Sequence, residues 1–284
     1  MSKGKAIYNP SGKAGEYARW ACNLYVGCSN DCAYCYCKRG VLGTAMGAPT
    51  PKLKSCFHDE QHAFEVFVKE LDANIDAIRQ SSLFFTFTSD PLIPETRALN
   101  VKCIDYAIQR RVRCQVLTKN ADFVQDKKLE CIISDRSGLH YSEYLSFGFT
   151  LTGHDELEPR ASSNSERIKA MNYLHSVGFK TFASFEPIID LEASYILVEK
   201  TLPFCDLYKF GLLSGKLPEA DGLYKAFGFG WRLENFYQDV CQVLKEAGRK
   251  AYWKESVKKV LLHYDILSEH SCNVPAEFNI FDNP

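Results

Sequence analysis

The sequence predicts a parallel α/β fold, and three observations lead to this prediction. Six short apolar runs of strand length follow one another along the 284 residues. Segments with helical periodicity lie between them, and the chain contains no internal repeat, low-complexity tract or long linker. Alternating strands and helices are typical of a parallel sheet, closed as a barrel or doubly wound. The runs are residues 23–27, 83–88, 113–118, 145–152, 179–185 and 206–212.

Three of the intervening helices are well marked. The first has apolar residues at the spacing of one helical face: Phe64, Phe67, Val68, Leu71, Ile75 and Ile78. The second begins with the capping-box pair Ser163 and Glu166, and Gly178 is placed to end it. The third has its apolar face at Leu233, Phe236, Val240 and Leu244 and stops near Gly248. Each follows one of the predicted strands, as a parallel sheet requires.

The run 145–152 favours a barrel over a doubly wound sheet. Its odd positions are apolar, whereas its even positions are small or polar: Ser146, Gly148, Thr150 and Thr152. A parallel strand that is buried on both faces reads as continuously apolar. The small polar face therefore suits the inside of an open or partial barrel that holds a polar ligand. A solvated edge strand is the alternative.

Composition narrows the class of protein. The charge is balanced, with 34 basic and 35 acidic residues, so no global field favours nucleic acid or a membrane. No run of eighteen apolar residues and no apolar signal core occur, which predicts a cytoplasmic protein without a membrane partner. Twelve cysteines in a chain of this length indicate metal binding where they cluster and buried packing where they are scattered.

Four cysteines do cluster, within the ten positions from Cys28 to Cys37. Cys28, Cys32 and Cys35 have the spacing C-x3-C-x2-C. Structural zinc prefers two separated pairs of ligands, and the chain has no second C-x2-C pair. Three thiolates in one loop suit a 4Fe–4S cluster whose fourth iron takes a non-protein ligand. The loop follows a strand-like run, which in a barrel places it at the face where active sites lie. We predict that Cys37 is not a ligand.

The motif C-x3-C-x-aromatic-C, with Tyr34 as the aromatic residue, resembles the radical S-adenosylmethionine superfamily. The stretches "NPSGKAGEYARWACNLYVGCSNDCAYCY", "FTSDP", "LTK", "FTLTGHDELEPRASSNSERI" and "FEPII" resemble its branch of spore photoproduct lyase-like proteins. This resemblance extends to about Asp190. It implies a partial (β/α)6 TIM-type barrel over residues 1–215, and a C-terminal helical extension packed on it over residues 216–284.

The resemblance also implies cofactors and chemistry. Three irons of a 4Fe–4S cluster would be held by the three cysteines, and S-adenosylmethionine would chelate the fourth. Reduction by an electron donor such as flavodoxin or ferredoxin would cleave this cofactor and give a 5′-deoxyadenosyl radical, which removes a hydrogen atom from the substrate. The protein would supply orientation and exclude water.

Several residues match positions that bind the cofactor in the family. The resemblance places Tyr34 near the adenine, although a core tyrosine is the alternative. It places Ser89 and Asp90, in "TSD", near the methionyl amine, and a carboxylate suits a cationic ammonium. A turn or a helix cap before Pro91 is the other interpretation of this stretch.

Four further residues complete the predicted site. Lys119 matches a lysine near the cofactor carboxylate or ribose, and a solvated lysine is the alternative. Thr150 matches a hydroxyl residue that contacts the ribose. Arg167 matches an arginine of the family, although it could equally lie on the surface; its charge opposes the dipole of the helix it would begin. Glu186, in "FEPII", is predicted to line the cavity or to cap a helix.

The sequence leaves the substrate open among three functions. These are a radical enzyme for nucleic-acid modification or repair, a radical enzyme for a small molecule or peptide, and an iron–sulfur protein that only transfers or senses electrons. Residues 221–236 could form a mobile lid. Residues 109–113 and 248–259 mix cations with aromatic residues, which suits base stacking or, equally, a helix end and an amphipathic edge.

We predict that the protein is not itself a spore photoproduct lyase. Those enzymes return a hydrogen atom through a cysteine that immediately precedes the Thr-Ser-Asp stretch. Here that position is Phe87, and a phenyl ring has no S–H bond. Cys114 on the neighbouring run is a conceivable substitute. The remaining cysteines are predicted to be structural.

Overall fold

The computed structural model describes residues 5–39, 42–126, 140–214, 224–225, 228–263 and 270–282. Within these residues the chain forms an eight-stranded sheet in the order β1-β2-β5-β6-β7-β8-β9-β10. All neighbours from β2 to β10 pair in parallel, and only β1 is antiparallel. The predicted α/β class with parallel strands is therefore confirmed. The strands are β1 (Ile7–Tyr8), β2 (Trp20–Cys22), β5 (Leu83–Phe85), β6 (Cys114–Thr118), β7 (Leu145–Thr150), β8 (Lys180–Ile188), β9 (Leu207–Leu212) and β10 (Lys250–Trp253).

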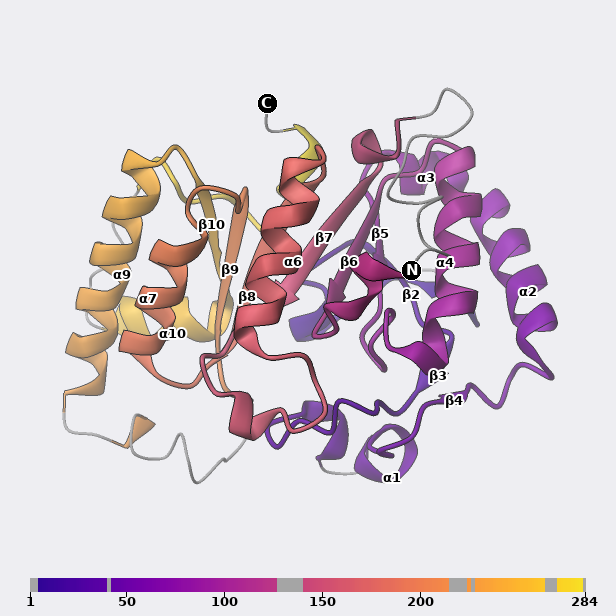
Figure 1. Cartoon of the computed structure of the whole chain (residues 1–284), viewed down its shortest axis with the longest axis horizontal. Coiled ribbons are helices and arrows are strands. Elements are labelled where there is room, and N and C mark those ends of the chain that lie inside the picture. Colours follow the sequence, from indigo (N-terminus) through magenta and orange to yellow (C-terminus); the bar gives the residue numbers. More distant parts are fainter. Residues whose placement is uncertain are drawn as a thin grey trace.

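Helices pack along the outside of this sheet (Figure 1). Helices α2 and α4 lie at the β2 end, α6 lies over the middle, and α7 and α9 lie at the β10 end. The predicted capping box is present, because the Ser163 side chain accepts from the Glu166 N–H and the Glu166 side chain accepts from the Ser163 N–H. The helices are α1 (Leu42–Met46), α2 (Glu60–Ala73), α3 (Ile75–Arg79), α4 (Pro94–Gln109), α6 (Asn164–Ser176), α7 (Leu191–Thr201), α9 (Phe229–Glu246) and α10 (Glu255–His263).

The first strand lies earlier than the sequence predicts. Residues 23–27 supply only β3 (Tyr25–Val26), which pairs with β4 (Lys52–Leu53) in a separate two-stranded sheet. The sheet strand β2 instead ends at Cys22. The Asn23 Oδ1 atom accepts from the Thr86 hydroxyl at 2.6 Å and from the Phe87 N–H at 2.9 Å. The Asn23 side chain thus accepts hydrogen bonds from the residues just after β5 and links the ends of β2 and β5.

The basic and aromatic stretch 248–259 contains a strand as well as the start of helix α10. Its first half is strand β10, which pairs with β9. Tyr252 and Trp253 are buried, and the Trp253 ring stacks on Phe210 with centroids 4.2 Å apart. The aromatic residues that suggested base stacking therefore belong to the core. The C-terminal part of the chain adds a strand as well as helices to the barrel.

The alternating pattern of β7 predicts an apolar core face and a polar face toward a ligand cavity. The structure shows the polar face at a cavity only at the end of the strand. Leu145, Phe147 and Phe149 join the hydrophobic core. On the opposite face a Cβ atom at Gly148 would lie 2.1 Å from the Phe182 ring, so glycine at this position leaves room for that ring. The inside of the barrel is consequently filled by aromatic residues at this level, and of the even positions only Thr150, at the end of the strand, lines a cavity.

The open side of the sheet is crossed by the segment between β1 and β2, called here the crossing segment (residues 9–19). It starts from one edge of the sheet and reaches the other. Glu16 Oε2 accepts from the Tyr252 hydroxyl at 3.0 Å and from the Glu255 N–H at 2.9 Å. The Lys254 ammonium donates to the Lys13 carbonyl at 3.1 Å. The partial barrel is therefore closed here by side-chain contacts rather than by strand pairing.

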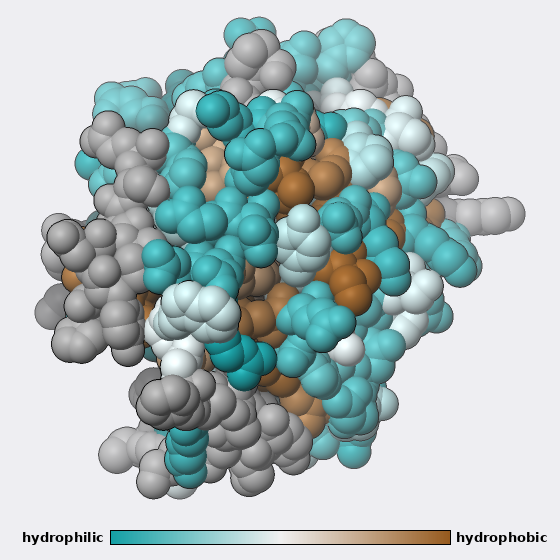
Figure 2. Space-filling view, turned by 90° about the vertical axis from the view of Figure 1, so that its left-hand side faces the viewer, coloured by the Kyte–Doolittle hydropathy of each residue, from teal (hydrophilic) through white to brown (hydrophobic). Residues whose placement is uncertain are grey.

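The face that carries α7, α9 and α10 is largely hydrophilic, with hydrophobic residues visible between polar ones (Figure 2). Trp231, in the first turn of α9, is 63% exposed. Among the described residues, no helix has both the length and the apolar character needed to cross a membrane.

Candidate functional site

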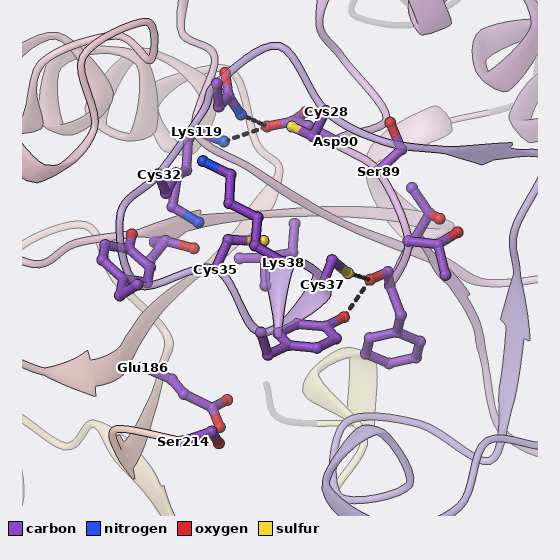
Figure 3. Close-up of a pocket in the computed structure, with 18 of the residues that line it drawn as sticks. Cys28, Cys32, Cys35, Cys37, Lys38, Ser89, Asp90, Lys119, Glu186 and Ser214 are labelled. Carbon is purple, nitrogen blue, oxygen red and sulfur yellow. Dashed lines mark hydrogen bonds between the residues drawn. The ribbon is translucent and has the colours of Figure 1, made fainter. Parts of the chain in front are cut away.

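A cavity of about 320 Å³ opens at the carboxyl ends of the parallel strands. Its lining comes from the loop after β3, from the residues that follow β5 and β6, and from the ends of β7 and β8. Active sites of parallel barrels lie at this face, because loops from successive strands converge there. Figure 3 shows Cys28, Cys32 and Cys35 around one side of the cavity, and Glu186 and Ser214 on the other.

The structure brings the cysteines of the loop to this one cavity, with Cys37 among them. The loop is held by backbone hydrogen bonds, from Cys28 N–H to the Ala48 carbonyl at 3.0 Å and from Ala33 N–H to the Leu157 carbonyl at 2.9 Å. The shape of the cysteine loop is therefore held by hydrogen bonds to other parts of the chain. Side-chain thiols from one loop then face a shared space, as a bound cluster requires.

The thiols differ in their tendency to ionise. Burial and the Asp90 charge raise the pKa of Cys28 to about 12. The Cys37 thiol donates to Cys35 and, against the effect of burial, lowers the pKa of Cys35 to about 6. The Cys37 thiol also lies 3.6 Å from the Phe87 carbonyl oxygen. Iron binds thiolates, so Cys35 is the thiol closest to the required state.

Two observations test whether the residues fit the cofactors. No three His, Cys, Asp or Glu side chains in the described ranges are grouped to hold one metal ion. A 4Fe–4S cluster binds each thiolate to a different iron, and the three thiols that line the cavity are donors of the type it takes. Asn30 Oδ1 and Ser89 Oγ line the same cavity, are buried and have no hydrogen-bond partner within the described chain. Buried polar atoms are normally paired, so this cavity fits a polar ligand.

Asp90 connects the cysteine loop to two strand ends. Its carboxylate accepts from Asn30 Nδ2 and from the Lys119 N–H, each at 2.8 Å. It also accepts from the Thr118 hydroxyl at 2.7 Å and from the Leu92 N–H at 3.0 Å. Because an ionised carboxylate has about four acceptor sites, the chain itself occupies them. The Asp90 carboxylate thereby holds the cysteine loop against the ends of β5 and β6.

Tyr34 is fixed by a buried ion pair. Its hydroxyl donates to Glu158, and the Arg167 guanidinium donates to the other oxygen of the same carboxylate. Arg167 is 0% exposed, so it is not a surface residue, and it does not line the cavity. It also donates to the Thr150 carbonyl at 2.6 Å and to the Ser162 carbonyl at 2.7 Å. Arg167 thus acts through Tyr34 and Thr150, and its pairing with Glu158 compensates the cost of a buried cation at the start of this helix.

Lys119 and Thr150 both line the cavity. The Lys119 ammonium lies 5.4 Å from the centroid of the Tyr34 ring. Burial alone would lower the pKa of Lys119, but the negative charges of Cys32 and Glu158 outweigh it, and the net pKa is raised. Lys119 is therefore a cation in the cavity, beside the cysteine loop, and is suited to an anionic group of a ligand.

The far wall of the cavity is a second polar network. The Lys254 ammonium donates to Glu186 Oε1 at 2.9 Å and to Oε2 at 2.7 Å. The Tyr17 hydroxyl donates to Glu186 Oε2 at 2.7 Å and lies 2.7 Å from Ser184 Oγ. Behind Tyr17, burial and the Lys254 charge lower the pKa of Lys209 to about 7. Glu186 lines the cavity, and the sequence does not reveal its partners there, Lys254 and Tyr17.

The sequence interpretation missed Glu158, Tyr17 and Lys254. Glu158 lies in the quoted "EPR" motif, nine residues before Arg167, and that pairing was an available signal. Tyr17 and Lys254 had none, because they meet Glu186 from 169 and 68 residues away. The predicted lid, 221–236, lies partly outside the described residues. Its described parts are Tyr224–Lys225 and the start of α9, and the Tyr224 hydroxyl donates to the Ile188 carbonyl at 2.5 Å.

No family model matches the chain. The sequence is 25% identical over 227 residues to the uncharacterised protein MJ0683 of Methanocaldococcus jannaschii, which covers 75% of this chain and 77% of that protein. The fold is similar to that of SuiB from Streptococcus suis bound to S-adenosylmethionine, with a TM-score of 0.51 and 13% identity over 79% of this chain. SuiB bound to its precursor peptide SuiA gives 0.50 and 14% over 77%. The match covers 47% of SuiB in each case, so the chain spans about half of that protein. This likeness supports the α/β barrel assignment.

Proposed function

We propose that the chain is a radical S-adenosylmethionine enzyme that holds a 4Fe–4S cluster through Cys28, Cys32 and Cys35. The observation that carries this proposal is the convergence of the three thiols on one cavity at the carboxyl ends of a parallel barrel. The motif C-x3-C-x-aromatic-C and the fold shared with a protein that binds S-adenosylmethionine support it. Placement within the spore photoproduct lyase-like branch rests on sequence resemblance.

In this proposal, different residues of the cavity bind different parts of S-adenosylmethionine. When bound, the cluster and S-adenosylmethionine supply reductive cleavage to a 5′-deoxyadenosyl radical that abstracts hydrogen from the substrate. Lys119 offers a cation to the cofactor carboxylate, and Thr150 offers a hydroxyl to the ribose. Tyr34, immobilised by Glu158, offers a ring face to the adenine. Ser89 Oγ offers a buried polar atom to the methionyl amine.

An electron-transfer protein without a substrate is the less suitable function. A carrier has no use for a cavity of about 320 Å³ that contains unpaired buried polar atoms. We propose instead that an external donor such as flavodoxin or ferredoxin supplies the electron. The cysteines in the described part of the chain are free thiols, which agrees with our proposal of a reducing, cytoplasmic location.

Anaerobic reconstitution with iron and sulfide, followed by a low-potential reductant and S-adenosylmethionine, tests the proposal. We expect 5′-deoxyadenosine and methionine in equal amounts from the wild-type protein. The matched control is Cys103→Ala, which removes a buried thiol outside the cavity. Cofactor cleavage that persists in Cys32→Ala, or that is absent from a wild-type protein with a full cluster, would contradict the proposal.

Two substrate classes follow from the proposal. A nucleic-acid substrate is suggested by the family resemblance alone. Burial of Tyr252 and Trp253 removes one argument for it. A small-molecule or peptide substrate is supported by the cavity of about 320 Å³ and by the fold shared with SuiB in complex with a precursor peptide. Salt-dependent binding of single-stranded DNA, duplex DNA and tRNA separates the classes, because phosphate contacts make affinity fall with ionic strength.

A further inference from the structure

The side chains of the far wall form a hydrogen-bond network in which every donor already has an acceptor. Lys254 has three N–H donors, which go to Glu186 Oε1, Glu186 Oε2 and the Lys13 carbonyl. The single proton of Tyr17 goes to Glu186. Ser184 must therefore donate its own proton to the Tyr17 oxygen, 2.7 Å away. No donor of these three side chains remains for a ligand.

Acceptor capacity does remain, and it faces the cavity. Glu186 Oε1 accepts one hydrogen bond from the described residues and Oε2 accepts two, so Oε1 keeps an open lone pair. The Glu186 side chain is 19% exposed, whereas that of Lys254 is 2% exposed. Ser184 Oγ, which also lines the cavity, keeps lone pairs as well. A ligand that reaches this wall meets acceptors, and Glu186 is the most accessible of them.

The charge of the wall is balanced. Glu186 carries one negative charge and Lys254 one positive charge, and their atoms lie 2.7 Å apart. Lys209 lies behind them, with its Nζ atom 4.6 Å from the centroid of the Tyr17 ring, and does not line the cavity. A cationic ligand would be repelled by Lys254, and an anionic ligand would meet the open lone pair of Glu186. An uncharged donor avoids both penalties.

The arrangement is supported by the backbone of β9. A Cβ atom at Gly211 would lie 3.0 Å from both the Glu186 Cγ and the Lys254 Cδ atoms. Glycine at this position leaves the space that the ion pair occupies. The pair is thus held by its neighbours at the lining of the cavity.

We infer that the wall of Tyr17, Ser184, Glu186 and Lys254 binds an uncharged hydrogen-bond donor of the substrate, a hydroxyl or carboxamide group. This inference rests on the proposed function, since it concerns the substrate of the same cavity. It places the donor group of the substrate across the cavity from the cysteines (Figure 3). The substrate class is therefore a molecule with a neutral O–H or N–H group, rather than an ammonium or a carboxylate, at the end that meets this wall.

Three small probes of similar size test the inference: acetamide, acetate and methylammonium. Their binding is measured by saturation-transfer NMR on the anaerobically purified full chain. We expect acetamide to bind best, and its affinity to fall by about two- to tenfold in Ser184→Ala or Glu186→Ala, the effect of a lost hydrogen bond. Ser214→Ala, on the same side of the cavity but outside the network, is the matched control and should keep wild-type affinity.

Changing the charge of the wall should change the order of the probes. Lys254→Met leaves the carboxylate unpaired, so methylammonium should become the preferred probe. Glu186→Gln leaves the ammonium unpaired, so acetate should become preferred. Circular dichroism on each variant establishes that it folds. Equal binding of all three probes to the wild type, no acetamide binding, or an unchanged order in the charge variants would overturn the inference. These measurements need no cluster or S-adenosylmethionine, so their failure is distinct from failure of the proposed function.

Discussion

Glu186 and Lys254 form an ion pair 2.7 Å long between the end of β8 and the residue that follows β10. The pair joins strands on both sides of β9 and faces the cavity from the side opposite the cysteines. Its position explains a feature that the sequence alone left ambiguous. Glu186 is at a strand end, where carboxylates often cap helices, but its partners here are Lys254 and Tyr17 rather than backbone amides.

The cluster should depend on three cysteines and not on the fourth. We expect Cys28→Ala, Cys32→Ala or Cys35→Ala to abolish the visible absorbance of the reconstituted cluster, because each removes the ligand of one iron. Cys37→Ala should retain the full iron content. Iron and sulfide analysis with absorbance spectroscopy is the measurement. Loss of about a quarter of the iron in Cys37→Ala, as expected if one of the four irons had lost its ligand, would identify Cys37 as a ligand instead.

Lys119 should matter for cofactor affinity and not for cluster assembly. Lys119→Met should weaken S-adenosylmethionine binding by about 1–3 kcal/mol, the value of a charge-assisted hydrogen bond. Equilibrium dialysis against the reconstituted protein measures this change. The control is Lys38→Met, which also removes a cation from the cavity lining but one that is paired with Asp31. Equal losses in the two variants would assign Lys119 a general electrostatic effect only.

Removal of one member of the buried Glu158–Arg167 ion pair should lower the stability of the fold. Both side chains are 0% exposed, so Arg167→Met leaves an uncompensated carboxylate, and we expect a loss of about 3–5 kcal/mol in the free energy of unfolding. The double variant Glu158→Leu/Arg167→Met should be less destabilised than the sum of the single variants. Denaturant titration of the anaerobic protein provides the values. Additive losses would show that the pair is not coupled.

Lys209 should make stability depend on pH above neutrality. Its folded pKa of about 7 lies below the unfolded value of about 10.4, so the unfolded chain binds more protons between these limits. The contribution of Lys209 to stability therefore rises with pH across this window, by up to about 1.4 kcal/mol per pH unit, and is lowest and constant below pH 7.

Replacement of Lys209 isolates this effect. Lys209→Met should be more stable than the wild type at pH 7, and the difference should shrink at pH 9. Unfolding free energies of both proteins at the two pH values are compared, with the exposed Lys200→Met as the control. A difference that does not change with pH would indicate that the burial of Lys209 is compensated in another way.

The fold was predictable because periodicity is local. Runs such as 145–150 and 207–212 carry strand patterns that neighbouring strands then confirm by pairing. The first strand was misplaced because Asn23 is polar yet buried, and its partners, Thr86 and Phe87, are more than 60 residues away. Strand β10 was missed because a mixture of lysine and aromatic residues is typical of a surface. Only pairing with β9 in the sheet buries these aromatic residues.

The site was predictable on the cysteine side and not on the opposite side. The spacing of Cys28, Cys32 and Cys35 lies within one loop, so the sequence displays it directly. The partners of Glu186 come from the crossing segment and from the residue after β10, and only folding brings them together. The role of Arg167 was likewise hidden, since its burial depends on Glu158 and on the end of β7.

The crossing segment determines which bonds would break if the barrel widened. The two edges of the sheet meet there through contacts such as Glu16 with Tyr252 and Lys13 with Ser214, at 3.0 and 2.6 Å. Partly exposed hydrogen bonds of this kind contribute about 0.5–1.5 kcal/mol each, far less than a strand ladder. Widening of the barrel along this line would break side-chain bonds of the crossing segment, including those of the buried Tyr17 to Glu186 and Ser184, and would leave every pair of strands intact.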